Sequence, residues 1–156
     1  MKPIKMKLFF PAVICAVFIT ISTSCSTSKD SNSITYIKHG SSFGMCRGYC
    51  YSESTYTKTE KIAFSKAYGR TNPEEFPDKM DTTSLDVKIW DGLVNSFVVD
   101  SFFKLDETVG CPDCADRGSE WLEIKTKKKV YKVTFDFGKE LNGMNDLLKL
   151  VREEKQ

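Results

Sequence analysis

The sequence lacks the features that identify several classes of protein. Its longest apolar run, from Leu8 to Ile21, has 14 residues and is broken by Pro11 and Thr20, whereas a transmembrane helix needs about 20 apolar residues. It has a single histidine, His39. It shows no phosphate-binding glycine loop, no paired acid motif and no nucleophile–base pair. We therefore predict neither a transmembrane helix nor an enzyme, and no cofactor.

An excess of charge of one sign is also missing. The formal net charge of +2 includes three lysines close to the N-terminus, Lys2, Lys5 and Lys7. The rest of the chain has 20 basic and 21 acidic residues, so it carries no electrostatic footprint for nucleic acid. One group of lysines straddles a predicted hairpin turn. We expect them to be solvated turn residues, with an anion or lipid-headgroup patch as the alternative; they are Lys125, Lys127, Lys128, Lys129 and Lys132.

The start of the chain has the features of an export signal. The three lysines form a positive region, the apolar run follows, and the small residues 22–24 stand directly before Cys25. This ending resembles the lipobox of bacterial lipoproteins, in which the cysteine is acylated and becomes the new N-terminus. Ser22 departs from the pattern, because an aliphatic residue is usual there. The alternative is an ordinary signal peptide, with Cys25 incidental.

The resemblance implies a signal peptide at residues 1–24 and a membrane anchor of acyl chains, palmitate among them, on Cys25. Residues 26–33 contain no apolar side chain and cannot offset their ordering entropy, so we expect residues 25–33 to form a flexible tether. The predicted location is the bacterial cell envelope, at the outer rather than the inner membrane. The partners would be the membrane and an unidentified envelope protein or ligand.

Residues 34–156 are long enough for a single domain. Period-2 patterns predict strands at 34–38, 51–57 and 62–68, and a hairpin of 121–125 with 130–137. Apolar residues at helical spacing predict a helix capped by Thr83 or Ser84, and a closing helix over 141–151. The segment 98–105 is expected to dock the first helix on the core. The predicted class is α+β, in the order β-β-β-α-β-β-α, with both helices on one face of an antiparallel sheet.

Four cysteines remain for this domain: Cys46, Cys50, Cys111 and Cys114. In an oxidising envelope we expect them to form disulfides, with the connectivity open. A four-cysteine zinc site is the first alternative. A thiol-redox pair at Cys111-Pro112-Asp113-Cys114 is the second, although no helix follows to lower the thiol pKa.

The remaining residues that could bind a metal or a ligand are interpreted as structural. His39 is expected in a glycine- and serine-rich loop. The acids Asp113, Asp116 and Glu120 do not match a calcium loop and are interpreted as turn and strand-start polarity. Trp90 and Trp121 are interpreted as packing residues.

One further resemblance concerns the mature domain. The segment 43–51 with its Cys46-x-Gly48-x-Cys50 pattern, the segment 100–105 and the closing hairpin and helix resemble a family of uncharacterised small bacterial lipoprotein domains. Tyr51 stands where many members have proline, and Cys111 and Cys114 are additional. The family implies fold and location but no chemistry. The predicted function is a disulfide-stabilised, non-enzymatic binding or scaffolding lipoprotein; the alternative is a thiol-redox or zinc-binding envelope protein.

Overall fold

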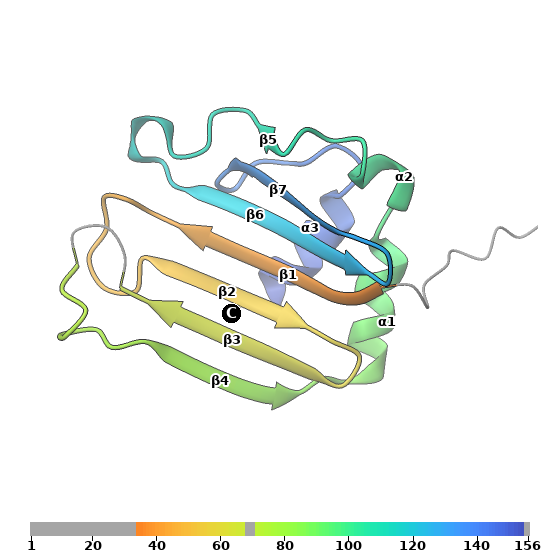
Figure 1. The fold of residues 1–156 in the computed structure, drawn as a ribbon, viewed down its shortest axis with the longest axis horizontal. Coiled ribbons are helices and arrows are strands. Elements are labelled where there is room, and N and C mark those ends of the chain that lie inside the picture. Colours follow the sequence, from red (N-terminus) through yellow and green to blue (C-terminus); the bar gives the residue numbers. More distant parts are fainter. Residues whose placement is uncertain (1–33, 68–70, 155–156) are drawn as a thin grey trace, which may run out of the picture.

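One mostly antiparallel sheet backed by helices makes up the structure (Figure 1). The structure, a computed structural model, describes residues 34–67 and 71–154, so the predicted signal peptide, Cys25 and the tether lie outside it. The seven strands stand in the order β4-β3-β2-β1-β6-β7-β5, and only the β5–β7 pair is parallel. The elements are β1 (Ile34–Ser42), β2 (Tyr51–Tyr56), β3 (Glu60–Lys66), β4 (Lys79–Ser84), α1 (Val87–Ser96), α2 (Val99–Phe102), β5 (Thr108–Val109), β6 (Ser119–Thr126), β7 (Val130–Asp136) and α3 (Asn145–Glu153).

The α+β class is confirmed, but the predicted element order is wrong. Four strands rather than three precede the first helix, two helices rather than one follow, and a two-residue strand precedes the hairpin. The fourth strand, β4, forms the sheet edge and all six of its side chains are exposed. An edge strand without a buried face has no apolar alternation, so its sequence, KMDTTS, carries no period-2 signal.

The first helix begins later than the sequence predicts. Asp86 is its N-cap, and its carboxylate accepts a hydrogen bond from the Lys88 N–H at 2.8 Å. The predicted caps, Thr83 and Ser84, instead end β4. The segment after α1 docks on the core, as expected, through the one-turn helix α2, whose Phe102 is completely buried.

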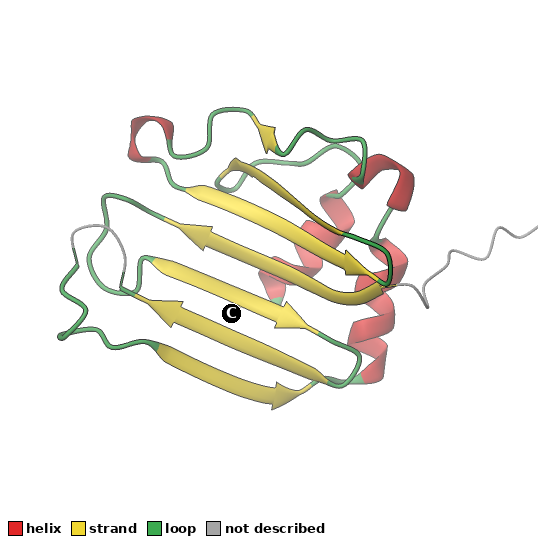
Figure 2. Ribbon diagram, viewed as in Figure 1, coloured by secondary structure: helices red, strands yellow, loops and turns green. Residues whose placement is uncertain are grey.

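The core lies between the sheet and the helices, which cover one face of the sheet (Figure 2). From α3, Leu147, Leu148 and Val151 are buried in it, each worth about 1.5–3 kcal/mol of burial. Within the part of the chain that the structure describes, no helix is long and apolar enough to cross a membrane.

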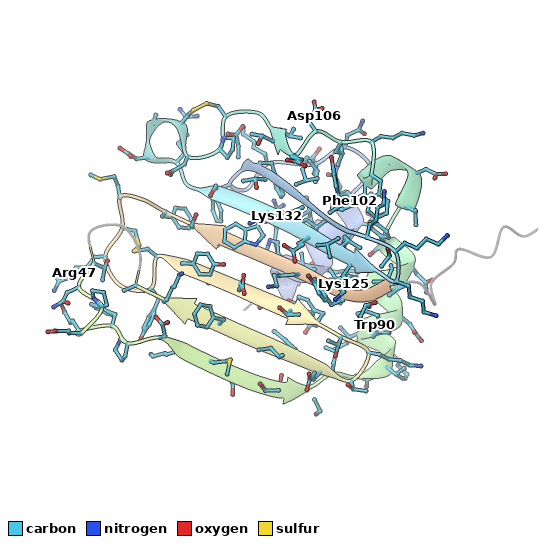
Figure 3. All side chains as sticks on the ribbon, viewed as in Figure 1. Arg47, Trp90, Phe102, Asp106, Lys125 and Lys132 are labelled. Carbon is cyan, nitrogen blue, oxygen red and sulfur yellow. A yellow bond between two sulfur atoms is a disulfide. The ribbon has the colours of Figure 1, made fainter. Side chains whose placement is uncertain are left out.

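The two ends of the sheet differ. β1 starts at Ile34, opposite Thr126 at the end of β6, and the β6–β7 turn lies at this end. β1 finishes at Ser42, opposite Ser119 at the start of β6, and the cysteine-containing loops lie at that end. Figure 3 shows the two ends through their labelled residues, Arg47 at one and Lys125 at the other.

Candidate functional site

The four cysteines form two local disulfides, Cys46–Cys50 and Cys111–Cys114, with Cα–Cα distances of 5.7 and 5.5 Å. The predicted disulfides are therefore confirmed, and the connectivity is the one in which each cysteine joins its near neighbour. The pairing takes up all four sulfurs, so they do not form the zinc cage. Among residues 34–67 and 71–154 no group of three or more histidine, cysteine or acidic side chains is placed to hold a metal ion.

Phe43 lies between the first disulfide-closed loop and the segment that follows the second. The first loop connects β1 to β2, and the Phe43 N–H donates to the Cys50 carbonyl at 2.9 Å. The second loop leads into β6, and the Phe43 ring occupies the space where a side chain on Gly118 would begin. Gly118 also has a φ of +81°, which only glycine adopts without strain. Phe43 thus contacts the first loop through its backbone N–H and the segment after the second bridge through its ring.

The sheet face beneath the helices changes from apolar to polar toward this end. The change occurs on the three central strands in register, because residues two apart on a strand share a face. The first row belongs to the core, and the last is made of hydroxyls and a carboxylate. The rows are Tyr56–Ile37–Ile124, then Ser54–His39–Leu122, then Ser52–Ser41–Glu120.

A cavity of about 600 Å³ opens over the polar rows, a size typical of small-molecule sites. Phe43 and Phe137 contribute its aromatic lining, with ring centroids 4.7 Å apart in an edge-to-face arrangement. Its full lining is His39, Ser41, Phe43, Ser52, Glu120, Phe137, Gly138 and Arg152. The cavity therefore combines an aromatic part with a hydrogen-bonding part.

Glu120 is the centre of the polar part and is almost completely buried, with 1% of its side chain exposed. One carboxylate oxygen, Oε1, lies 2.5 Å from His39 Nε2 and accepts from Arg152 Nε at 2.9 Å. The other, Oε2, accepts from Arg152 Nη2 at 2.8 Å and from the Gly138 N–H at 2.9 Å. Strands β1 and β6, the segment after β7 and helix α3 all contribute to this one group.

The hydrogen bonds to Glu120 determine its ionisation state. Burial by itself would raise the pKa of Glu120, but the hydrogen bonds from His39, Arg152 and the Gly138 N–H outweigh it and lower the pKa to about 2. Glu120 is thus a carboxylate at neutral pH and can only accept. The hydrogen between Glu120 and His39 consequently sits on His39 Nε2.

The network positions donors rather than a reactive base. Arg152 is held by both carboxylate oxygens and also donates to the Lys139 carbonyl at 2.8 Å, so its guanidinium has one orientation at the cavity wall. Ser41 and Ser52 lie side by side on the floor, with their hydroxyl oxygens 3.4 Å apart. The arrangement suits a small ligand that has hydrogen-bonding groups at one end and a flat apolar part.

Two of these residues have other roles than the sequence interpretation gave them. His39 is not in a loop but within β1, with 2% of its side chain exposed. Glu120 does stand at the start of β6, as its second residue, but it is buried and forms an ion pair. The predicted strands ended at Lys38 and began at Trp121, whereas β1 continues to Ser42 and β6 begins at Ser119. Extending the second predicted strand back by one position would have placed Glu120 on the core face with Leu122 and Ile124. The alternation of Ile34 and Tyr36 does not place His39 there, because the register shifts between those two residues.

The two tryptophans are packing residues, as expected. Trp90 belongs to the core. Trp121 lies on the other face of the sheet, with its indole over Gly40, and is only 4% exposed. The Lys132 ammonium stands 4.7 Å from its ring centroid.

Comparison with known proteins gives no relative for this chain: no protein-family model matches it, and no curated protein matches it.

Proposed function

We propose that this protein is a lipid-anchored envelope domain that binds a small ligand in the cavity between β1, β6 and α3. The observation that carries the proposal is the cavity itself, in which an aromatic lining faces a buried Glu120 held by four hydrogen bonds. Aromatic surface supplies affinity and a few fixed polar groups supply orientation in sites of this kind.

The lipid anchor rests on the first 25 residues and on the disulfides. Bonds such as Cys46–Cys50 persist in oxidising compartments and are rare in the cytosol, which supports export. The small-residue stretch before Cys25 supports acylation of that cysteine. We place the domain in the cell envelope on these grounds.

Binding is favoured over catalysis by the state of Glu120. A general base works best with a pKa close to the working pH, whereas the pKa of Glu120 is about 2. Four donors already surround its two oxygens. A carboxylate in this state orients Arg152 and His39 and is a poor proton acceptor for a substrate.

The test is a titration with anilinonaphthalene sulfonate, whose fused rings and anionic sulfonate match the two parts of the cavity. The protein is the chain with Cys25→Ser, and binding is followed by fluorescence. We expect saturable binding of one dye per chain. Ser52→Phe, which fills the cavity floor, should abolish it. Thr82→Phe, which also introduces a phenylalanine but on the exposed strand β4, should not.

A second variant separates loss of the cavity from loss of the fold. Phe137 is 46% exposed, so Phe137→Ala removes half of the aromatic pair with little effect on stability, and the dye should bind several-fold more weakly. Binding of several dyes per chain, or equal binding by Ser52→Phe and Thr82→Phe, would contradict the proposal.

A further inference from the structure

The β6–β7 turn carries three consecutive exposed lysines, Lys127, Lys128 and Lys129. It is a tight turn, closed by the Thr126 N–H donating to the Lys129 carbonyl at 2.9 Å, and it projects from the end of the sheet. Glu123 is the one acid between residues 123 and 132, and its carboxylate accepts from the Tyr36 hydroxyl at 2.6 Å. The exposed lysines of this turn cluster are Lys125, Lys127, Lys128 and Lys129. Lys132 is also exposed, but its ammonium lies over the Trp121 ring farther along the sheet.

The turn cluster lies where the described chain begins. Ile34, the first residue of β1, pairs with Thr126, the last residue of β6. Cys25 precedes Ile34 by nine residues, and a chain of that length spans about 30 Å at most. An anchor on Cys25 therefore keeps this end of the sheet within about 30 Å of the membrane surface.

Exposed apolar side chains lie at the same end. Lys129 of the turn contacts Phe103, the residue directly after α2, with its ammonium 3.5 Å from the centroid of the phenylalanine ring. Val98 and Val99, at the start of α2, are 38% and 39% exposed, and Val130 in the turn is 50% exposed. The segment from residue 98 to residue 107 carries three exposed acids, Asp100, Asp106 and Glu107, and one lysine, Lys104, so the positive charge of this end is concentrated in the turn cluster.

We propose that this end of the domain, the turn cluster with its flanking valines, docks on the surface of an anionic membrane. The proposal rests on the lipid anchor of the proposed function and adds the orientation of the domain relative to the membrane. Lysines near an anionic surface each contribute attraction that short-range contacts of apolar side chains reinforce. The cavity, formed around Ser41 and Glu120 at the other end of the strands, is then directed away from the membrane.

The experiment uses the chain with Cys25→Ser, so that no acyl chain contributes, and measures co-sedimentation with vesicles. The vesicles are pure phosphatidylcholine, or one part phosphatidylglycerol to three parts phosphatidylcholine, at low ionic strength. The test variant replaces Lys127, Lys128 and Lys129 by glutamine. The control replaces the exposed Lys79, Lys139 and Lys149 by glutamine, which gives the same net charge.

We expect binding to the anionic vesicles only. The test variant should bind between about 10-fold and 100-fold more weakly, and the control should bind like the parent chain. Equal binding to both kinds of vesicle, equal loss in both triple variants, or no vesicle binding by the parent would overturn the docking proposal. Because the test involves neither acyl chain nor cavity ligand, these outcomes leave the anchor and dye experiments to be judged separately.

Discussion

Glu120 and Arg152 form a bidentate ion pair that connects the closing helix α3 to the central strand β6. Nε and Nη2 of the guanidinium donate to the two oxygens of the carboxylate at 2.9 and 2.8 Å. Glu120 is 1% exposed and Arg152 33%. The pair thus joins a buried charge on β6 to a half-buried one on α3, at the edge of the cavity.

Removing the charge of Glu120 should destabilise the protein. Glu120→Gln leaves Arg152 without its ionic partner, and breaking one side of a buried pair costs about 3–5 kcal/mol; the partial exposure of Arg152 should reduce this to about 2–3 kcal/mol. The measurement is urea unfolding. Glu53→Gln, which breaks the more exposed pair with Lys38 at 3.3 Å, is the control and should cost under about 1 kcal/mol. Equal losses would show that Glu120 is not the stabilising centre.

Stability should depend on acid pH through the same residue. The pKa of Glu120 falls from 4.5 to about 2 on folding, so its contribution is fully present above pH 4.5 and is lost as the pH falls toward 2. The contribution amounts to about 3 kcal/mol. Urea midpoints from pH 7 downward should therefore drop more steeply for the parent chain than for Glu120→Gln. Parallel pH curves for the two proteins would refute this assignment.

The two disulfides should be reduced in a fixed order. Cys111 and Cys114 are both exposed, whereas Cys50 is only 1% exposed, and thiol exchange requires access to a sulfur. A mild reductant followed by alkylation and peptide mass analysis should label Cys111 and Cys114 first. The opposite order would mean that the β1–β2 loop opens more readily than its packing indicates.

Gly40 should tolerate no side chain. Its position beneath the Trp121 indole leaves no room for a Cβ, so Gly40→Ala should cost about 1–3 kcal/mol through overpacking. In α1, a Cβ added to Gly92 would meet no atom within 4 Å, and Gly92→Ala should stabilise by about 0.5–1 kcal/mol. Adding Trp121→Ala should remove most of the Gly40→Ala penalty; an unchanged penalty would show that another contact causes it.

The anchor has its own test. Replacing Cys25 by alanine removes the proposed acylation site, and the protein should move from the membrane pellet to the soluble fraction. Cys46→Ala, at a cysteine far from the export signal, is the matched control and should stay in the pellet. Retention of Cys25→Ala in the pellet would contradict the lipoprotein assignment.

Sequence periodicity predicted those elements that have one buried and one exposed face. The hairpin of β6 and β7 and the helix α3 alternate clearly, because their core-facing side chains are apolar. It missed β4, which buries no side chain. Disulfides were predictable from cysteine number and compartment, but their pairing depended on the geometry of two loops.

The cavity could not be predicted for a related reason. Its residues come from β1, β2, β6, α3 and the segments after β1 and β7, which only the strand order brings together. His39 and Glu120 are polar residues on a buried face, so they break the apolar pattern from which strands are recognised. The position at which the apolar alternation of a strand ends is therefore also a position at which a buried polar site can begin.

The position of β1 determines how the domain would carry a mechanical load. β1 is bonded on both sides, to β2 and to β6, and the chain enters it at Ile34, at one end of its axis. A force that pulls on this end while the cavity end is held acts along the axis of β1. The ladder hydrogen bonds run perpendicular to that axis, so the force shears them. The bonds of two ladders then share the force at once instead of opening one after another, so the strand at which the described chain begins is also the one best placed to resist being drawn out.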